Sequence, residues 1–270
     1  MFDSADDSWV AEAVSSLAAE QLVSRFGHVT RSQKADGSLL TEADTAMQAA
    51  VAAALESRFP GGAVLAEEQS PEIQRSLLEQ AAEGVWCLDP LDGTTNFVSG
   101  MPLFAVSLAH VRRGEVSFGL VHDPMRGETF TARRGAGARL NGQPLGPPVA
   151  PGGLAESVAV VDFKRLDPAL ATRLAIAPPF RSQRSLGSVA LDWSWLAAGR
   201  FQLYLHGGQR LWDYAAGQLI AREAGAGVCI ASTVSGNCGF ALSLESRVAI
   251  GASDASSLMS WRQWLDAAGS

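Results

Sequence analysis

The sequence has little of what marks several large functional classes. Basic residues are in the minority, with 21 Lys and Arg against 28 Asp and Glu, and they form no run. Because a nucleic-acid groove needs a cationic surface, we expect no direct binding to nucleic acid. No stretch reaches the roughly 18 consecutive apolar residues of a membrane span, and the first residues, MFDSADDSWV, are acidic. We therefore expect a cytoplasmic protein that does not enter a membrane.

Cysteine is also scarce. Cys87, Cys229 and Cys238 are an odd number and form no CxxC pair. This usage suits a reducing cytosol better than a disulfide framework, so we expect small buried apolar side chains at these positions. Cys and His in zinc-binding spacing are missing, and so is the phosphate-binding GxxxxGK[ST] loop.

What the sequence does contain is enough apolar material for a large core, since 47% of its 270 residues are hydrophobic. Apolar spacing and turn residues predict helices and strands in an order that favours a layered α/β or α+β architecture. The predicted helices cover 9–26, 42–59, 71–82, 188–198, 213–224 and 254–267. The predicted strands cover 63–66, 85–88, 103–111, 116–121, 128–132, 157–161, 201–205, 227–231 and 247–250.

Residues 142–153, GQPLGPPVAPGG, are rich in proline and glycine. Such a composition favours an irregular connection between compact units. It predicts an N-terminal lobe over 1–150, with most of the site, and a C-terminal lobe over 151–270 that supplies Asp213 and substrate contacts.

Acidic residues follow two of the predicted strands. Glu67 comes after the strand at 63–66 and Asp89 after the strand at 85–88, with Asp92 on the same loop. Carboxylates that are brought together repel one another, and a hard divalent cation such as Mg²⁺ would compensate their charge. Two such ions about 4 Å apart can activate a water and stabilise the leaving oxygen in phosphoryl transfer. If residues 93–96 open a helix, their free N–H groups form a phosphate cradle.

Each of these motifs also has an alternative interpretation. The loop fits an EF-hand poorly, and its acids are too far apart for the paired aspartates of a haloacid-dehalogenase-type phosphatase. Thr41 and Asp44 also match a helix capping box, and Asp213 alone would be a first-turn helix acid. Glu67 and Glu68 alone would be solvated surface charges. It is the combination of these acids that favours a functional site.

With these motifs the sequence resembles the inositol monophosphatase family of Mg²⁺-dependent, lithium-sensitive phosphatases. The matching segments occur in family order over nearly the whole chain. They are Thr41-Glu42-Ala43-Asp44, Ala66-Glu67-Glu68, Asp89 to Phe97 (DPLDGTTNF), Gly135 to Ala138 with Asn141-Gly142, and Trp212 to Gly217 with Glu223-Ala224-Gly225. The resemblance implies an α+β fold, a layered αβαβα sandwich, and a homodimer.

The resemblance also implies roles for individual residues. Glu67, Asp89 and the Leu91 carbonyl would hold a first Mg²⁺. Asp89, Asp92 and Asp213 would hold a second, and Glu68 would contribute with Glu67 to a third, weaker one. Thr94, hydrogen-bonded to Asp44, would orient the attacking water together with Glu67. The N–H groups of Gly93 and Thr94 would bind the phosphate.

The substrate is the least constrained prediction. Inositol-selective members carry a Glu seven residues before the second-motif Asp, and here that position is His206. Gly187, Ser188 and Val189 match a segment that contacts the alcohol, and Arg184 could also face the pocket. We expect a small phosphorylated metabolite, such as inositol 1-phosphate, fructose 1,6-bisphosphate, histidinol phosphate or 3′-phosphoadenosine 5′-phosphate. An accessory factor of the transcription machinery is the alternative of another class.

Overall fold

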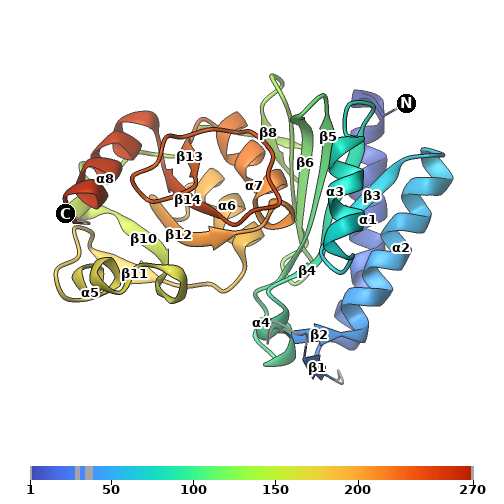
Figure 1. Cartoon of the computed structure of the whole chain (residues 1–270), viewed down its shortest axis with the longest axis horizontal. Helices are drawn as coiled ribbons and strands as arrows, with labels where there is room; N and C mark the ends of the chain where they lie inside the picture. The colour runs from blue at the N-terminus through green and yellow to red at the C-terminus, as the bar shows by residue number, and fades with distance from the viewer. Residues whose placement is uncertain (1, 28–30, 34–38, 269–270) are drawn as a thin grey trace.

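The computed structural model describes residues 2–27, 31–33 and 39–268. Its elements form five layers, which Figure 1 shows nearly edge-on from helices α1 and α2 to helices α5 and α8. A seven-stranded sheet and a five-stranded sheet are the two β layers, and α6 and α7 lie between them. The predicted αβαβα sandwich is therefore confirmed. None of the helices in the described part of the chain is long and apolar enough to cross a membrane.

The seven-stranded sheet follows chain order, and all its neighbours are antiparallel except the parallel pair β3 and β4. Its strands are β3 (Ala63–Ala66), β4 (Val85–Asp92), β5 (Ala105–Arg112), β6 (Glu115–Asp123), β7 (Glu128–Arg133), β8 (Ala138–Leu140) and β9 (Gln143–Leu145). A separate small hairpin consists of β1 (Arg31–Gln33) and β2 (Leu39–Thr41).

The five-stranded sheet has the order β11-β10-β12-β14-β13 and combines parallel with antiparallel pairs. Its strands are β10 (Val158–Asp162), β11 (Ser182–Arg184), β12 (Leu203–Gln209), β13 (Gly227–Ala231) and β14 (Arg247–Ala252). Residues 146–153 connect the two sheets without helix or strand, and the division into two lobes there stays a prediction.

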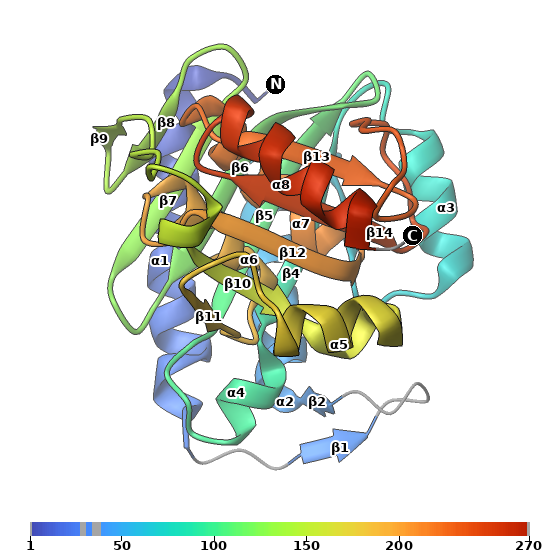
Figure 2. The ribbon, with the colours of Figure 1, turned by 90° about the vertical axis from the view of Figure 1, so that its left-hand side faces the viewer.

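The helices make up the remaining three layers. The larger ones are α1 (Asp7–Gln21), α2 (Glu42–Arg58), α3 (Pro71–Glu79), α5 (Pro168–Ile176), α6 (Val189–Ala197), α7 (Leu211–Glu223) and α8 (Ala255–Ala268), and α4 (Thr94–Val98) is short. Helices α1 and α2 share an apolar core with the outer face of the large sheet. On the opposite side of the molecule, α8 packs on β13 and β14 and contacts α5 (Figure 2).

Helix α7 approaches the large sheet unusually closely. Gly119 on β6 is flanked by Ala109 on β5 and Ala132 on β7, so that a row of small residues crosses the sheet. A Cβ at Gly119 would lie only 2.7 Å from the carbonyl oxygen of Ala216 on α7. Since such a contact leaves no room for a side chain, glycine is required here. The row fixes α7, and with it Asp213 in the first helical turn.

Most predicted elements are present, with the predicted bounds of β3 and β13 unchanged. The first helix ends earlier than predicted, at Gln21, and β4 continues beyond Leu88 to Asp92. Helix α5 and the short strands β8, β9 and β11 were not predicted. The extension of β4 matters most, because it places Asp89 and Asp92 within a strand that is buried along its whole length.

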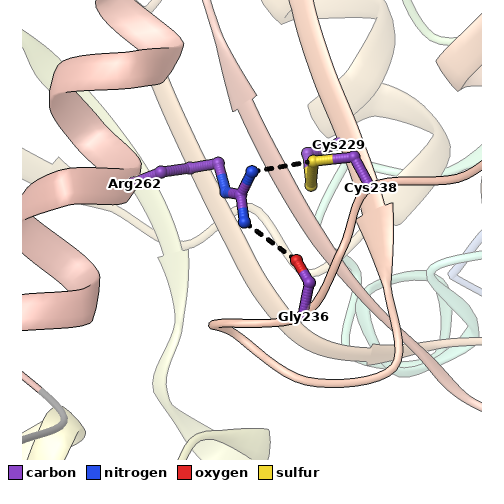
Figure 3. The surroundings of a disulfide bond; sticks show 4 residues. All are labelled: Cys229, Gly236, Cys238 and Arg262. Atoms are coloured by element: carbon purple, nitrogen blue, oxygen red, sulfur yellow. Dashed lines mark hydrogen bonds between the residues drawn. A yellow bond between two sulfur atoms is a disulfide. The ribbon is translucent and has the colours of Figure 1, made fainter.

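The prediction for the cysteines was wrong for two of the three. Cys229, in β13, forms a disulfide with Cys238, in the segment that follows (Figure 3). The Arg262 side chain donates to Cys238 Sγ at 3.1 Å and to the Gly236 carbonyl at 2.8 Å. The chain between the two cysteines turns back on β13 and brings their Cα atoms to 4.9 Å, which sequence spacing alone does not reveal. Cys87 is buried and free, as expected.

Candidate active site

A cleft of about 1160 Å³ opens where the ends of β3, β4, β10 and β12 meet the first turns of α4, α6 and α7. Nearly all predicted site residues line it, although they are up to 146 positions apart in the chain (213 minus 67). They are Glu67, Glu68, Asp89, Leu91, Asp92, Gly93, Thr94, Gly187, Ser188, Val189, His206 and Asp213.

Three of the acids are held by backbone or hydroxyl donors. Asp89 Oδ1 accepts from the Leu91 N–H at 3.0 Å. Asp92 Oδ2 accepts from the Ser188 hydroxyl and, at 2.8 Å, from the Ala190 N–H. Asp213 Oδ2 accepts from the Arg210 N–H at 2.8 Å, within the first turn of α7. Asp89 and Asp213 are therefore tied to their own elements, and Asp92 is tied to the start of α6, before any ligand is considered.

Burial and mutual repulsion make these carboxylates hard to ionise. Burial, followed by the charge of Glu67, raises the pKa of Asp89 well above its usual value. Burial raises the pKa of Asp92 to about 6, although the Ser188 hydroxyl opposes the shift. Burial and then the charge of Asp92 raise the pKa of Asp213 to about 8. None of the ion pairs formed within the described ranges includes these three acids.

This donor set fits a hard divalent cation. All of its members are oxygen donors, and a bound cation would relieve the repulsion that raises their pKa values. Among the residues that the structure describes, no three His, Cys, Asp or Glu side chains are arranged so that they could hold a metal ion as they stand. Closing a coordination shell therefore requires side-chain rearrangement within the cleft.

Asp44 lies outside the cleft lining but is connected to it through Thr94. Its Oδ2 accepts from the Thr41 backbone N–H at 2.8 Å and the Thr41 hydroxyl at 2.6 Å, which completes the capping box of α2. Its Oδ1 lies 3.3 Å from the Thr94 hydroxyl. The same hydroxyl lies 3.0 Å from the Leu91 carbonyl. Asp44 thus fits both predictions: its Oδ2 completes the helix cap with Thr41, and its Oδ1 contacts the Thr94 hydroxyl.

Gly93 begins helix α4 with a φ of +91°, a conformation that side chains rarely adopt. A Cβ here would lie 2.9 Å from the Leu103 carbonyl oxygen. Asn96, one turn further on, donates to the carbonyls of Leu103 and Leu186, both at 2.7 Å. Helix α4 is therefore docked against the segment that leads into α6, and the two predicted substrate segments share one wall of the cleft.

His206 lines the cleft, but its own ring nitrogens contact protein groups. Nε2 lies 2.9 Å from Asp162 Oδ2, and Nδ1 accepts from the Gly208 N–H at 3.2 Å. An accepting Nδ1 carries no proton, so the neutral ring has its proton on Nε2 and donates it to Asp162. This hydrogen bond is the main reason that the pKa of Asp162 falls to about 2.

Arg184 does not reach the cleft in the way its position suggested. Its guanidinium donates to the Ser182 hydroxyl and the Gln183 carbonyl, both at 2.7 Å, and its side chain is exposed on β11. The reason is local, because these acceptors belong to the strand from which Arg184 itself projects. It is absent from the residues that line the cleft.

Other polar residues line the cleft that sequence reasoning missed. Asp162 follows the predicted strand 157–161, so the strand-end signal that identified Glu67 and Asp89 also applied to it. Asp192, in the first turn of α6, is buried, and burial followed by the charge of Asp92 raises its pKa well above the usual value. No sequence motif distinguishes the other charged residues of the lining, which include Arg75, Lys164, Arg165, Arg210 and Glu245.

Residues 3–263 match the model of the inositol monophosphatase family, and the chain belongs to this family. Members of the family are phosphomonoesterases. The chain is 38% identical over 219 residues to the Nus factor SuhB of Vibrio cholerae. The alignment covers 73% of this chain and 74% of that protein.

Solved structures agree with the sequence match. The IMPase of Thermotoga maritima superposes with a TM-score of 0.80 at 28% identity, covering 96% of both chains. The extragenic suppressor protein SuhB of Bartonella henselae gives a TM-score of 0.79 at 27% identity, covering 97% of both. The relatives thus include a protein named IMPase, one named Nus factor and one named extragenic suppressor protein.

Proposed function

We propose that this protein is a Mg²⁺-dependent phosphate monoester hydrolase that resembles inositol-1-monophosphatase. The observation that carries the proposal is the convergence of Glu67, Asp89, Asp92 and Asp213 on one cleft with the start of α4. Glu67, Asp89 and the Leu91 carbonyl would hold one ion, Asp89, Asp92 and Asp213 a second, and Glu68 would contribute to a third. When bound, Mg²⁺ would supply a water activated for attack and neutralise the charge of the phosphate.

The protein's own groups would orient the reactants. The Thr94 hydroxyl has one proton, and donating it to Asp44 leaves its lone pairs free to accept a hydrogen bond from the attacking water. Glu67 would hold the same water. The N–H groups of Gly93 and Thr94 would bind the phosphate. No residue here needs to form a covalent intermediate, since positioning and charge neutralisation supply most of the rate enhancement.

A phosphate-release panel with Mg²⁺ tests the proposal. It compares inositol 1-phosphate, fructose 1,6-bisphosphate, histidinol phosphate and 3′-phosphoadenosine 5′-phosphate. We expect release that depends on Mg²⁺ and is inhibited by Li⁺, and turnover in the presence of EDTA would contradict the mechanism. Sedimentation of the purified protein tests the homodimer that the family resemblance implies.

The curated relatives favour a second candidate function, that of an accessory factor in transcription. In that role the protein would act through its surface, and hydrolysis would be dispensable. The two functions can be separated in a bacterium that grows poorly after the gene of such a relative is deleted. This strain is supplied with the gene for the unchanged protein or for the Asp89→Asn variant. Growth restored by this variant would favour the accessory role, whereas growth restored only by the unchanged protein would favour the phosphatase.

A further inference from the structure

Cationic side chains gather on one side of the cleft. Lys164 and Arg165 belong to a short 3-10 turn (Phe163–Arg165) that follows β10, and Arg210 directly precedes α7. Glu67, Asp89 and Asp92, by contrast, lie at the ends of β3 and β4. A substrate whose scissile phosphate lies on the acidic side would therefore place its alcohol portion toward the basic side.

The basic turn is held in place by Asp162. Its Oδ1 accepts from the Lys164 N–H at 2.8 Å, and its Oδ2 lies 3.1 Å from Arg165 Nη1. The same Oδ2 accepts from His206 Nε2 at 2.9 Å. His206 is thus a positioning residue that fixes the carboxylate which in turn orients Arg165.

Two glycines make room for the turn on the end of β12. A Cβ at Gly207 would lie 1.9 Å from the Arg165 carbonyl oxygen, so no other residue fits without moving the backbone. A Cβ at Gly208 would lie 3.4 Å from Arg165 Cδ. The pair Gly207-Gly208 therefore determines where Lys164 and Arg165 stand relative to the cleft.

The charges on this side favour an anion. Lys164 takes part in none of the ion pairs of the described ranges, and the Arg165 side chain is 52% exposed although it is anchored to Asp162. The cations Lys164, Arg165 and Arg210 thus share this side with the carboxylates Asp162, Asp213 and Glu245. Asp213 is a proposed metal ligand and Asp162 already accepts several hydrogen bonds, so both carboxylates have partners of their own.

We propose that Lys164 and Arg165, assisted by Arg210, bind a second anionic group on the alcohol portion of the substrate. The ligand would be a phosphomonoester that also carries a second phosphate or a carboxylate, rather than the phosphate of a neutral polyol. A guanidinium with free N–H groups and a neighbouring ammonium are the usual partners of both anions. This inference rests on the proposed phosphatase function.

Two matched substrate pairs test it with the full-length protein and Mg²⁺. Fructose 1,6-bisphosphate is compared with fructose 1-phosphate, and 3-phosphoglycerate with glycerol 3-phosphate. We expect kcat/KM to favour the doubly anionic member of at least one pair by on the order of tenfold, and the pair that responds identifies the second anion. The preference is expected mainly in KM, because the contact is made equally in ground and transition states.

Variants assign the preference to residues. Arg165→Gln and Lys164→Gln should each lower the ratio of the two kcat/KM values toward one. Lys164→Gln should leave the fold intact, because the Lys164 ammonium takes part in none of the ion pairs of the described ranges. His206→Gln, which can still donate to Asp162, should keep the ratio, and His206→Leu should lower it. Arg75→Gln is the matched control, since Arg75 lines the cleft from α3 and pairs with exposed Glu72.

The outcomes are distinguishable. Equal kcat/KM values within both pairs for the unchanged protein would overturn the second-anion site and leave the phosphatase function standing. A preference that survives both Arg165→Gln and Lys164→Gln would also overturn it. Phosphate release from inositol 1-phosphate but from none of these four compounds would overturn the second-anion site alone. Absence of release from these four and from every compound of the phosphatase panel would overturn both proposals together.

Discussion

The Ser188 hydroxyl donates to the carboxylate of Asp92, 96 positions earlier in the chain. The same hydroxyl accepts from the Leu191 N–H at 3.3 Å, and the Asp92 carboxylate accepts from the Ala190 N–H at 2.8 Å. Ser188 and Asp92 therefore cap helix α6 together. Ser188 directly precedes the helix, whereas Asp92 belongs to β4 of the large sheet. A proposed metal ligand is thus also the cap of a buried helix.

Ser188→Ala should weaken both roles. Loss of an N-cap hydroxyl costs about 1 kcal/mol, and Asp92 loses the donor that best stabilises its ionised form. We expect a lower free energy of unfolding and a several-fold loss of kcat/KM with Mg²⁺. Urea unfolding and phosphate release measure the two effects, and Ser188→Thr, which keeps the hydroxyl, is the control. Unchanged stability would show that Asp92 alone suffices as the cap.

Asp89→Asn should abolish phosphate release while the protein stays folded. Asp89 is buried in β4, and its pKa is raised by burial and by neighbouring acids, so the ionised carboxylate destabilises the metal-free protein. Without metal we therefore expect the Asn variant to unfold at a temperature at least about 2 °C higher than the unchanged protein. Thermal unfolding in EDTA and in Mg²⁺ makes the comparison, and Mg²⁺ should stabilise only the unchanged protein. Glu72→Gln, at an exposed site, controls for loss of one charge.

His122 should make the protein sensitive to acid. Burial lowers its pKa from 6.5 to about 4, and its Nδ1 lies 2.8 Å from the Thr129 hydroxyl. Between these two values the unfolded chain binds a proton that the folded protein does not. Stability from this group is therefore complete above pH 6.5 and is lost as the pH falls through about 4.

The variant His122→Gln isolates this effect. Its free energy of unfolding should fall less between pH 7.5 and pH 4, with a difference of up to about 3 kcal/mol from the unchanged protein. Urea unfolding at a series of pH values measures the slope. If the free energy of unfolding changed with pH in the same way for both proteins, His122 would have the same pKa in the folded and the unfolded state.

Gly119→Ala should disturb the site from the centre of the large sheet. The new methyl group would lie 2.7 Å from the Ala216 carbonyl and 3.0 Å from its Cα, both of them backbone atoms that a side-chain movement cannot relieve. Overpacking of this kind costs about 1–3 kcal/mol, and a shift of α7 would carry Asp213 with it. We expect lower stability and lower kcat. Gly146→Ala, where nothing lies within 4 Å, is the matched control and should change neither.

The Cys229–Cys238 disulfide should contribute measurable stability. The two cysteines are 9 positions apart, and closing a loop of about this length stabilises a protein by on the order of 2–3 kcal/mol. Dithiothreitol should therefore lower the unfolding temperature of the unchanged protein but not that of Cys238→Ser. An equal effect of dithiothreitol on both proteins would show that the disulfide contributes nothing.

The elements that the sequence predicted best are those with local signals. Strand β3 and helix α2 are bounded by turn residues and a capping box that act within a few positions. Helix α5 has such signals too, since Asp167 caps it and Pro168 occupies its first turn, but the helix is only 9 residues long and its apolar repeat is too short to stand out in the sequence. Strand β4 was predicted too short because two acids inside a fully buried strand contradict ordinary strand composition.

The parts of the site that escaped prediction depend on contacts between distant segments. Arg165 enters the cleft because β10 and β12 pair in parallel, which sets Asp162 opposite His206. The disulfide depends on the path of the chain after β13, and no spacing rule encodes that path. Arg184, by contrast, stays outside the cleft because its guanidinium donates to the Ser182 hydroxyl and the Gln183 carbonyl of its own strand.

Helix α7 presents Asp213 to the cleft while its remaining length fills the space between the two sheets. Because nearly all of its residues are buried, the helix cannot detach locally without exposing the apolar faces of both sheets. Helix α7 therefore cannot unfold while the rest of the molecule stays folded. The proposed turnover should consequently disappear together with global structure during denaturation, and an activity measurement on this protein would report the folded fraction directly.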